Sequence, residues 1–135
     1  MRAGFTLIEL LLVLVILTVL AAVVVPKFTS RSEQARVAAA RTDITNLGVA
    51  LDAYEIDVGR FPSSDEGLRA LIEAPASARN WTGPYIKKRV IPIDPWGNLY
   101  IYRFPGQHNP GEYDLYSLGS DGREGTDDID NWSQQ

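Results

Sequence analysis

An unbroken apolar run occupies the start of the chain. Only three side chains over residues 5–25 are polar, namely Thr6, Glu9 and Thr18. At about 1.5 Å per residue, a helix of this length measures about 31 Å, which is enough to cross the hydrocarbon core of a bilayer. The pattern therefore predicts a transmembrane helix over residues 5–25.

A second helical pattern follows Pro26. Apolar residues recur there at spacings of three and four, as on the buried face of an amphipathic helix. They are Val37, Ala40, Ile44, Leu47, Leu51, Tyr54 and Val58. Proline removes one backbone donor, so we expect Pro26 to bend or loosen the helix without necessarily ending it. We predict one helix from Phe5 to Val58, about 80 Å long, which Gly59 and Pro62 end.

Shorter elements are predicted beyond the helix. Residues 63–66, Ser-Ser-Asp-Glu, form a capping-box pattern that opens a short helix with Leu68, Leu71 and Ile72 on one face. Pro75 ends this helix, and residues 76–90 are predicted to be loop.

The last third of the chain carries strand patterns. Residues 94–97, Asp-Pro-Trp-Gly, have the chemistry of a type I turn. The β-branched and aromatic segment 99–104 and the segment 112–117 then predict two strands, which we expect to pair as an antiparallel hairpin on the helix stripe. Residues 118–135, rich in Gly and Asp, predict a loop with a short closing strand. The predicted fold class is α+β.

Charge and cysteine content narrow the functional classes. The chain has 135 residues, a net charge of −4 and no cysteine, so it has neither a disulfide framework nor a thiol metal site. Basic residues follow the apolar run, whereas residues 112–135 hold seven acids and one arginine. This distribution argues against nucleic acid as a partner. Arg2 places the N-terminus in the cytoplasm by the positive-inside rule.

Glu9 is out of place in the apolar run. A lone carboxylate at the centre of a membrane helix costs about 2.5 to 3.5 kcal/mol on insertion scales, and somewhat less near the interface. Two explanations are open. Glu9 is either an assembly group that meets a positive partner on another chain, or an acid at a helix start that the helix dipole favours and water reaches.

An acidic loop over residues 120–130 is the second candidate site. Its glycines let the backbone fold tightly, so several carboxylates can converge on one calcium ion, which accepts six to eight oxygen ligands. The spacing is not that of an EF-hand, because Arg123 and Gly125 occupy the third and fifth positions counted from Asp121. A solvated acidic turn is the alternative.

The N-terminal residues Gly4-Phe5-Thr6-Leu7-Ile8-Glu9, followed at once by the apolar helix, resemble the class III signal of type IV pilins and type II secretion pseudopilins. This resemblance implies that a prepilin peptidase cuts after Gly4 and methylates the new amino terminus of Phe5. It also implies that the apolar run is kept, and that Glu9 of one subunit meets the amine of its neighbour.

Four later segments resemble the G-type major pseudopilins of type II secretion. They are residues 60–68, 83–88, 92–98 and 113–122. The resemblance implies a pilin-like fold, in which a long N-terminal helix packs on a small antiparallel sheet with a C-terminal metal-binding loop. The expected parts are a leader (1–4), a transmembrane and assembly helix (5–25) and a periplasmic domain (26–135). The last divides into helix 26–58, a variable region 59–90, and the hairpin with its calcium loop, 91–135.

The same resemblance implies a structural calcium ion. Carried over by position, its ligands are the side chains of Asp121, Asp127 and Asp128 and the carbonyls of Leu118 and Gly125. The loop is slightly shorter than the family's pattern, so the choice among Asp127, Asp128 and Asp130 stays open. We expect the ion to tie the C-terminal tail to the hairpin, with Trp132 packing beneath.

The expected protein is a single-pass subunit of the inner membrane, with its N-terminus in the cytoplasm and its domain in the periplasm. Its expected function is to polymerise into a helical filament that drives protein export across the outer membrane. The resemblance implies minor pseudopilins, an inner-membrane platform protein and a secretion ATPase as partners.

No catalytic triad, phosphate cradle or acid/base pair is visible, so the sequence predicts no enzyme, and His108 is expected at the surface. Alternatives are a type IV or competence pilin, and a soluble periplasmic calcium-binding module released from an ordinary signal peptide.

A signal peptide fits the N-terminus poorly. Its charged region is Arg2 alone, its apolar part is too long, and Leu20-Ala21-Ala22 is a poor cleavage site. Separately, the basic run 87–89 is expected on a solvated face, from which it can meet Asp52 or Glu55 of another subunit.

Overall fold

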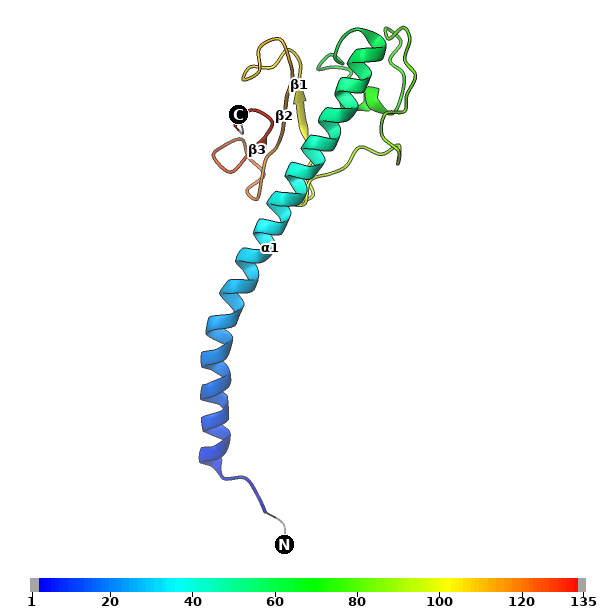
Figure 1. Cartoon of the computed structure of the whole chain (residues 1–135). Helices are drawn as coiled ribbons and strands as arrows, with labels where there is room; N and C mark the ends of the chain where they lie inside the picture. The colour runs from blue at the N-terminus through cyan, green and yellow to red at the C-terminus, as the bar shows by residue number, and fades with distance from the viewer. Residues whose placement is uncertain (1–2, 134–135) are drawn as a thin grey trace. The chain divides into compact units, whose positions relative to one another are not determined.

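A computed structural model describes residues 3–133, the side chains of residues 25–29 excepted. Arg2, on which the orientation rests, lies outside the described residues. The elements are helix α1 (Leu7–Val58), the 3-10 helix η1 (Leu68–Leu71) and strands β1 (Ile101–Arg103), β2 (Asp114–Ser117) and β3 (Ile129–Asp130) (Figure 1). The chain divides into two compact units, Met1–Ala35 and Arg36–Gln135.

The first unit contains the apolar turns of α1. The helix begins at Leu7, two residues later than predicted, because Thr6 is its N-cap. The window Leu7–Val24 is long and apolar enough to cross a membrane, and none of it is buried within the part of the chain that the structure describes. The helix continues through Pro26, as predicted.

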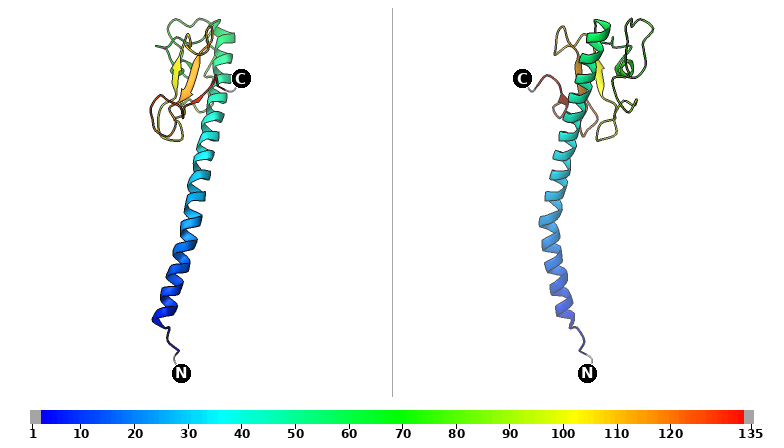
Figure 2. Two further views of the ribbon diagram at one scale, coloured as in Figure 1. Left: turned by 90° about the vertical axis from the view of Figure 1, so that its left-hand side faces the viewer. Right: turned by 45° about the vertical axis from the view of Figure 1, so that its right-hand side comes forward.

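In the second unit, the later turns of α1 pack against the sheet. The sheet lies against one side of these turns in the left-hand view of Figure 2. The predicted apolar stripe is confirmed as the helical part of the core: Ala40, Ile44, Leu47, Leu51 and Tyr54 are buried, and Val37 and Val58 pack against them. Leu115 from β2 and Ile129 from β3 are buried in the same core.

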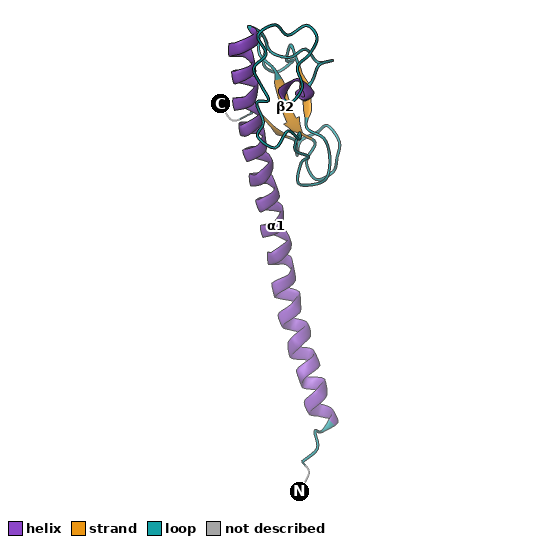
Figure 3. Cartoon of the chain, turned by 90° about the vertical axis from the view of Figure 1, so that its right-hand side faces the viewer, coloured by secondary structure: helices purple, strands orange, loops and turns teal. Residues whose placement is uncertain are grey.

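Gly59 ends α1 as predicted. It adopts φ +84°, which glycine reaches without steric cost, and its N–H donates to Glu55 O at 2.7 Å. The capping box at residues 63–66 is also confirmed, since Ser63 N–H donates to Glu66 Oε2 at 2.8 Å and Glu66 N–H to Ser63 Oγ at 3.2 Å. The helix that follows is the single turn η1, and loops form most of the segment between it and β1 (Figure 3).

The hairpin and the closing strand form a three-stranded antiparallel sheet in the order β1-β2-β3. Ile101 pairs with Tyr116 in the first ladder, and Ser117 with Ile129 in the second. The predicted turn at residues 94–97 is confirmed by Gly97 N–H donating to Asp94 O at 3.0 Å.

Both hairpin strands are shorter than predicted. Leu99 makes an isolated bridge with Ile93 instead of joining β1. At the other end of β1, Phe104 N–H donates to Ser64 Oγ at 2.9 Å. Glu112, predicted as the start of the second strand, lies in a turn and donates its N–H to Asn109 O.

Candidate functional site

The predicted processing site lies ahead of the helix. Gly4 and Phe5 are in a non-helical, exposed segment, and the Phe5 side chain is 84% exposed. A peptidase can therefore reach the backbone between them without unwinding α1.

Glu9 takes part in a capping box at the start of α1. Its carboxylate accepts a hydrogen bond from Thr6 N–H at 2.9 Å, and its own N–H donates to Thr6 Oγ1 at 3.3 Å. Two backbone donors that the helix itself leaves unpaired are satisfied in this way. The carboxylate thus has a partner within its own chain, and this partner survives a cut after Gly4.

Carboxylates of the acidic loop accept hydrogen bonds from other residues of the same loop. Asp127 Oδ2 accepts from Ser120 Oγ at 3.2 Å and from Asp121 N–H at 3.4 Å, and Asp128 Oδ2 accepts from Gly125 N–H at 3.2 Å. Within residues 3–133, no group of three or more Asp, Glu, His or Cys side chains is arranged as a metal site. The predicted ligands therefore share one loop without converging on a point.

One oxygen of this loop has no partner. Asp128 Oδ1 is buried and makes no hydrogen bond within the described part of the chain. Burial raises the pKa of Asp128, the charges of Asp127 and Asp121 raise it further, and the Gly125 N–H opposes them. An unsatisfied oxygen among like charges is the environment that a bound cation stabilises.

Glu124 of this loop binds the sheet. Its Oε1 accepts from Arg103 Nη2 at 2.6 Å and from Tyr116 OH at 2.5 Å, both on the sheet. The Tyr116 hydroxyl and the Arg103 charge lower the pKa of Glu124. This contact attaches the middle of the loop to β1 and β2.

A buried serine fixes the start of the loop. Ser117 Oγ donates to Asp94 Oδ2 at 2.7 Å and accepts from Gly119 N–H at 3.1 Å. Asp94 Oδ1 also accepts from Trp96 N–H and Asn98 N–H. Sequence reasoning missed this clasp, although an aspartate that opens a turn accepts hydrogen bonds from the backbone N–H groups that follow it.

A second buried acid, Asp114, holds the loop at residues 107–109, on which the C-terminal segment packs. Asp114 accepts from the backbone N–H groups of Gln107, His108 and Asn109. Burial alone would raise the pKa of Asp114, but these hydrogen bonds outweigh it and lower the pKa. His108 is half-exposed, and its ring stacks on Trp132 with centroids 4.0 Å apart. Trp132 therefore packs on this loop and on Tyr116.

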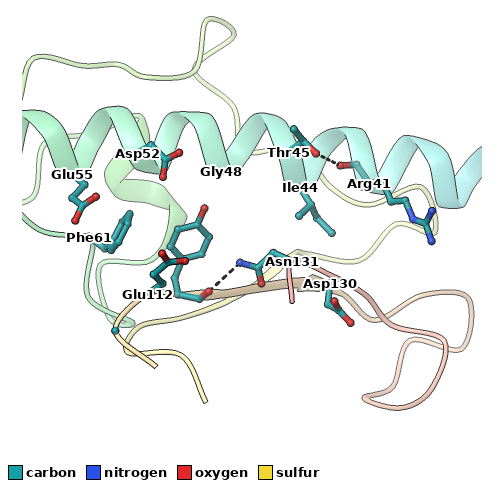
Figure 4. Close-up of a pocket in the computed structure, with 12 residues that line it drawn as sticks. Arg41, Ile44, Thr45, Gly48, Asp52, Glu55, Phe61, Glu112, Asp130 and Asn131 are labelled. Carbon is teal, nitrogen blue, oxygen red and sulfur yellow. Dashed lines mark hydrogen bonds between the residues drawn. The ribbon is translucent and has the colours of Figure 1, made fainter. Parts of the chain in front are cut away.

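A hollow of about 600 Å³ lies between α1 and the end of the sheet (Figure 4). Asp52, Glu55 and Glu112 line it, with Phe61 and Tyr113 beside them. Burial raises the pKa of Tyr113 to about 12, and the charges of Asp52, Glu112 and Glu55 contribute. Asp52 and Glu55, the acids of α1 that the basic run 87–89 of another subunit was expected to meet, thus line a negatively charged hollow.

A membrane-length apolar helix whose later turns pack on a small antiparallel sheet defines a pilin-like protein. The solved structure of the major pseudopilin from the type 2 secretion system of enterohaemorrhagic Escherichia coli has this fold, with a TM-score of 0.69 and 34% sequence identity. The match covers 78% of this chain and 90% of that one.

Family comparisons agree with the fold. The model of type II secretion system protein G matches residues 27–132, and the model of the prokaryotic N-terminal methylation motif matches residues 1–25. Type II secretion system core protein G of Pseudomonas aeruginosa is 48% identical over 97% of this chain and 95% of the relative. Type II secretion system core protein G of Escherichia coli K12 is 47% identical, over 97% of this chain and 91% of that relative. The chain belongs to the type II secretion system protein G family, which confirms the resemblance.

Proposed function

We propose that this chain is the major structural subunit of the type II secretion pseudopilus and polymerises through its N-terminal helix to drive protein export across the outer membrane. The observation that carries the proposal is the window Leu7–Val24, none of which is buried by the described residues. Such a surface needs lipid or neighbouring helices around it. Before assembly the window anchors the subunit in lipid, and after assembly it packs against the helices of neighbouring subunits.

Glu9 sets the register of the assembly. A cut after Gly4 leaves a free amine on Phe5, and helices that pack side by side with an axial offset bring this amine to Glu9 of the next subunit. Such a pair contributes little raw stability, but removing one partner from a buried pair costs about 3 to 5 kcal/mol. Misaligned subunits are therefore rejected.

The proposal includes processing, orientation and partners. A prepilin peptidase cuts after Gly4 and methylates Phe5, and the subunit lies in the bacterial inner membrane with its N-terminus in the cytoplasm and its domain in the periplasm. The energy for assembly comes from a cytoplasmic ATPase acting through an inner-membrane platform protein, and minor pseudopilins join the same filament.

A Glu9→Leu variant tests the proposal, with Thr18→Leu as its control. Thr18 is another polar residue of the same helix, and its hydroxyl donates to Leu14 O at 2.7 Å, so it is already satisfied. We expect Glu9→Leu to be processed but to yield at least tenfold fewer filaments and little export, and Thr18→Leu to behave as wild type. The readouts are sheared filaments, the secreted protein and the intact mass of the mature chain.

Two results would contradict the proposal. If the Glu9→Leu variant formed filaments of normal length and exported normally, Glu9 would not set the register of the assembly. A mature chain that starts near Val23 instead of at a methylated Phe5 would show a released soluble module.

We also propose that the acidic loop binds one structural calcium ion through Asp121, Asp127, Asp128 and the carbonyls of Leu118 and Gly125. The buried, unpartnered oxygen of Asp128 supports this, because hard oxygen donors suit calcium. Bound calcium supplies positive charge that relieves the repulsion within the loop. The chain's own residues hold the loop in place, Ser117 at its start and Glu124 at its middle.

Calcium titration of the full chain in detergent checks the ligand set. Asp128→Asn is expected to lower the affinity at least tenfold. Glu73→Gln is the control, because Glu73 pairs with Arg69 outside the acidic loop, and the affinity of this variant is expected to stay within twofold of wild type. Equal affinities for Asp128→Asn and wild type would exclude Asp128 as a ligand.

A further inference from the structure

The turn at residues 94–98 contacts both ends of the segment that leads from β2 into the acidic loop. At the first end, Ser117 is fully buried and its Oγ donates to Asp94 Oδ2 at 2.7 Å. At the other end, a Cβ on Gly122 would lie 3.5 Å from Asn98 Nδ2. The fold thus brings the turn against this segment, although 23 residues separate Asp94 from Ser117.

Asp94 fixes the conformation of the turn itself. Its Oδ1 accepts from Trp96 N–H at 3.1 Å and from Asn98 N–H at 2.7 Å, and its own N–H donates to Asn98 O at 2.8 Å. Water has little access to these contacts, because Asp94 is only 3% exposed. Hydrogen bonds to a carboxylate are among the strong ones. The turn is therefore a firm support for Ser117, which binds the remaining oxygen of Asp94.

Ser117 in turn orients one of the proposed calcium ligands. Its Oγ accepts from Gly119 N–H at 3.1 Å. This N–H and the Leu118 carbonyl belong to the same planar peptide group, so a hydrogen bond that fixes the one also fixes the direction of the other. The pair Asp94 and Ser117, called the clasp here, therefore holds the Leu118 carbonyl in place.

The same segment touches a second proposed ligand. A Cβ on Gly119 would lie 2.5 Å from the Asp127 carbonyl oxygen and 2.9 Å from Asp127 Oδ2, so the backbones of these two residues pack closely. Asp127 Oδ2 also accepts from Ser120 Oγ at 3.2 Å. The clasp is thus connected to Asp127 through the peptide that it holds.

We propose that Asp94 and Ser117 are positioning residues that set the affinity of the acidic loop for calcium, although neither is a proposed ligand. The inference rests on the proposed calcium site. Of the proposed ligands, the Leu118 carbonyl is held in place before binding, and the carboxylates of the loop have to move. Without the clasp, ordering the Leu118 peptide becomes part of the cost of binding, and the affinity falls.

A double-mutant cycle on the calcium affinity tests the clasp. The full chain in detergent is titrated with calcium as wild type, Ser117→Ala, Asp94→Asn and the double variant. Asp94→Asn keeps one oxygen for the N–H groups of the turn, but its NH2 group cannot accept from the Ser117 hydroxyl. We expect each single variant to raise the Kd at least fivefold. The double variant should bind no more weakly than the weaker single variant, because both changes break the same contact.

Glu66→Gln is the control for lost charge and lost stability. It also removes one carboxylate charge and breaks a native ion pair, and Glu66 binds Arg60, Ser63 and Ser77, which lie outside the turn and the acidic loop. Its Kd is expected to stay within twofold of wild type. All chains are compared at a temperature at which each is folded, so that a merely structural defect leaves the Kd unchanged.

The outcomes separate this inference from the calcium proposal. Equal Kd values for Ser117→Ala and wild type would overturn the positioning role and leave the calcium site standing. If Asp94→Asn weakened binding as much in the Ser117→Ala background as in wild type, its charge and not the clasp would be responsible, and the inference would be wrong. A wild-type chain that bound no calcium would defeat the calcium proposal, and this inference with it.

Discussion

Glu66 shows how a single side chain fixes the segment after α1. Arg60 donates to both of its oxygens, at 2.7 and 2.8 Å, and Ser77 Oγ donates to Oε1 at 2.6 Å. Hydrogen bonding by the Arg60 guanidinium lowers the pKa of Glu66 to about 2, against the opposing effect of burial. Charge-assisted, two-pronged pairs of this kind are stronger than neutral hydrogen bonds.

Glu66→Gln should lower the free energy of unfolding by about 1 to 2 kcal/mol at pH 7, a modest value because the pair is partly open to solvent. Since the folded pKa lies below the unfolded one, the stabilisation is complete above about pH 4.5 and is lost as the pH falls towards 2. The difference between wild type and variant should shrink over this window. Denaturant unfolding of the full chain in detergent measures it.

Glu73→Gln is the control for that measurement. Glu73 pairs with Arg69 at 2.8 Å, but both side chains are well exposed, so no measurable change is expected. A pH-independent difference for Glu66→Gln would show that its charge is not responsible.

At the scale of elements, the loop after β2 depends on one glycine. Gly119 has φ +68°, and a Cβ there would lie 2.5 Å from the Asp127 carbonyl oxygen. Gly119→Ala should therefore destabilise the domain by about 1 to 3 kcal/mol, through backbone strain and the displaced loop. Gly125→Ala, whose Cβ would meet nothing closer than 4.0 Å, should have little effect. Thermal melting compares the two, and equal melting temperatures would refute the expectation.

The elements themselves were largely predictable from the sequence. The stripe from Val37 to Val58 gave the buried face of α1, because helical periodicity over six turns is a strong signal. The strand ends were not predictable. Phe104 leaves the ladder because its N–H finds Ser64, forty residues away, and no local pattern encodes such a contact.

The candidate site was predictable only in part. Gly4, Phe5 and Glu9 stand in a local motif, and the structure adds that Thr6 caps the helix. The clasp of Asp94 and Ser117 and the attachment of Glu124 to the sheet were missed, because they join residues that only the fold brings together. The calcium ion itself remains a prediction.

For the whole molecule, calcium removal should have a global effect. A ligand that binds only the folded state stabilises it by about 2.7 kcal/mol at a hundred times its Kd. For a unit of this size, that corresponds to a melting temperature lower by at least about 10 °C in excess chelator. Melting of the full chain in detergent, with and without chelator, checks this. Asp128→Asn should lose most of the difference, and an unchanged wild-type curve would contradict the calcium proposal.

A subunit waiting alone in the bilayer keeps its Glu9 carboxylate satisfied by its own Thr6 amide. When a neighbour's amine arrives under the proposed pairing, the carboxylate can accept from it and still keep the Thr6 hydrogen bond, which uses only Oε2. Because such a pair contributes little raw stability, the reverse step is accessible. A fibre made of such units can be dismantled and its parts returned to the membrane pool, ready for another cycle.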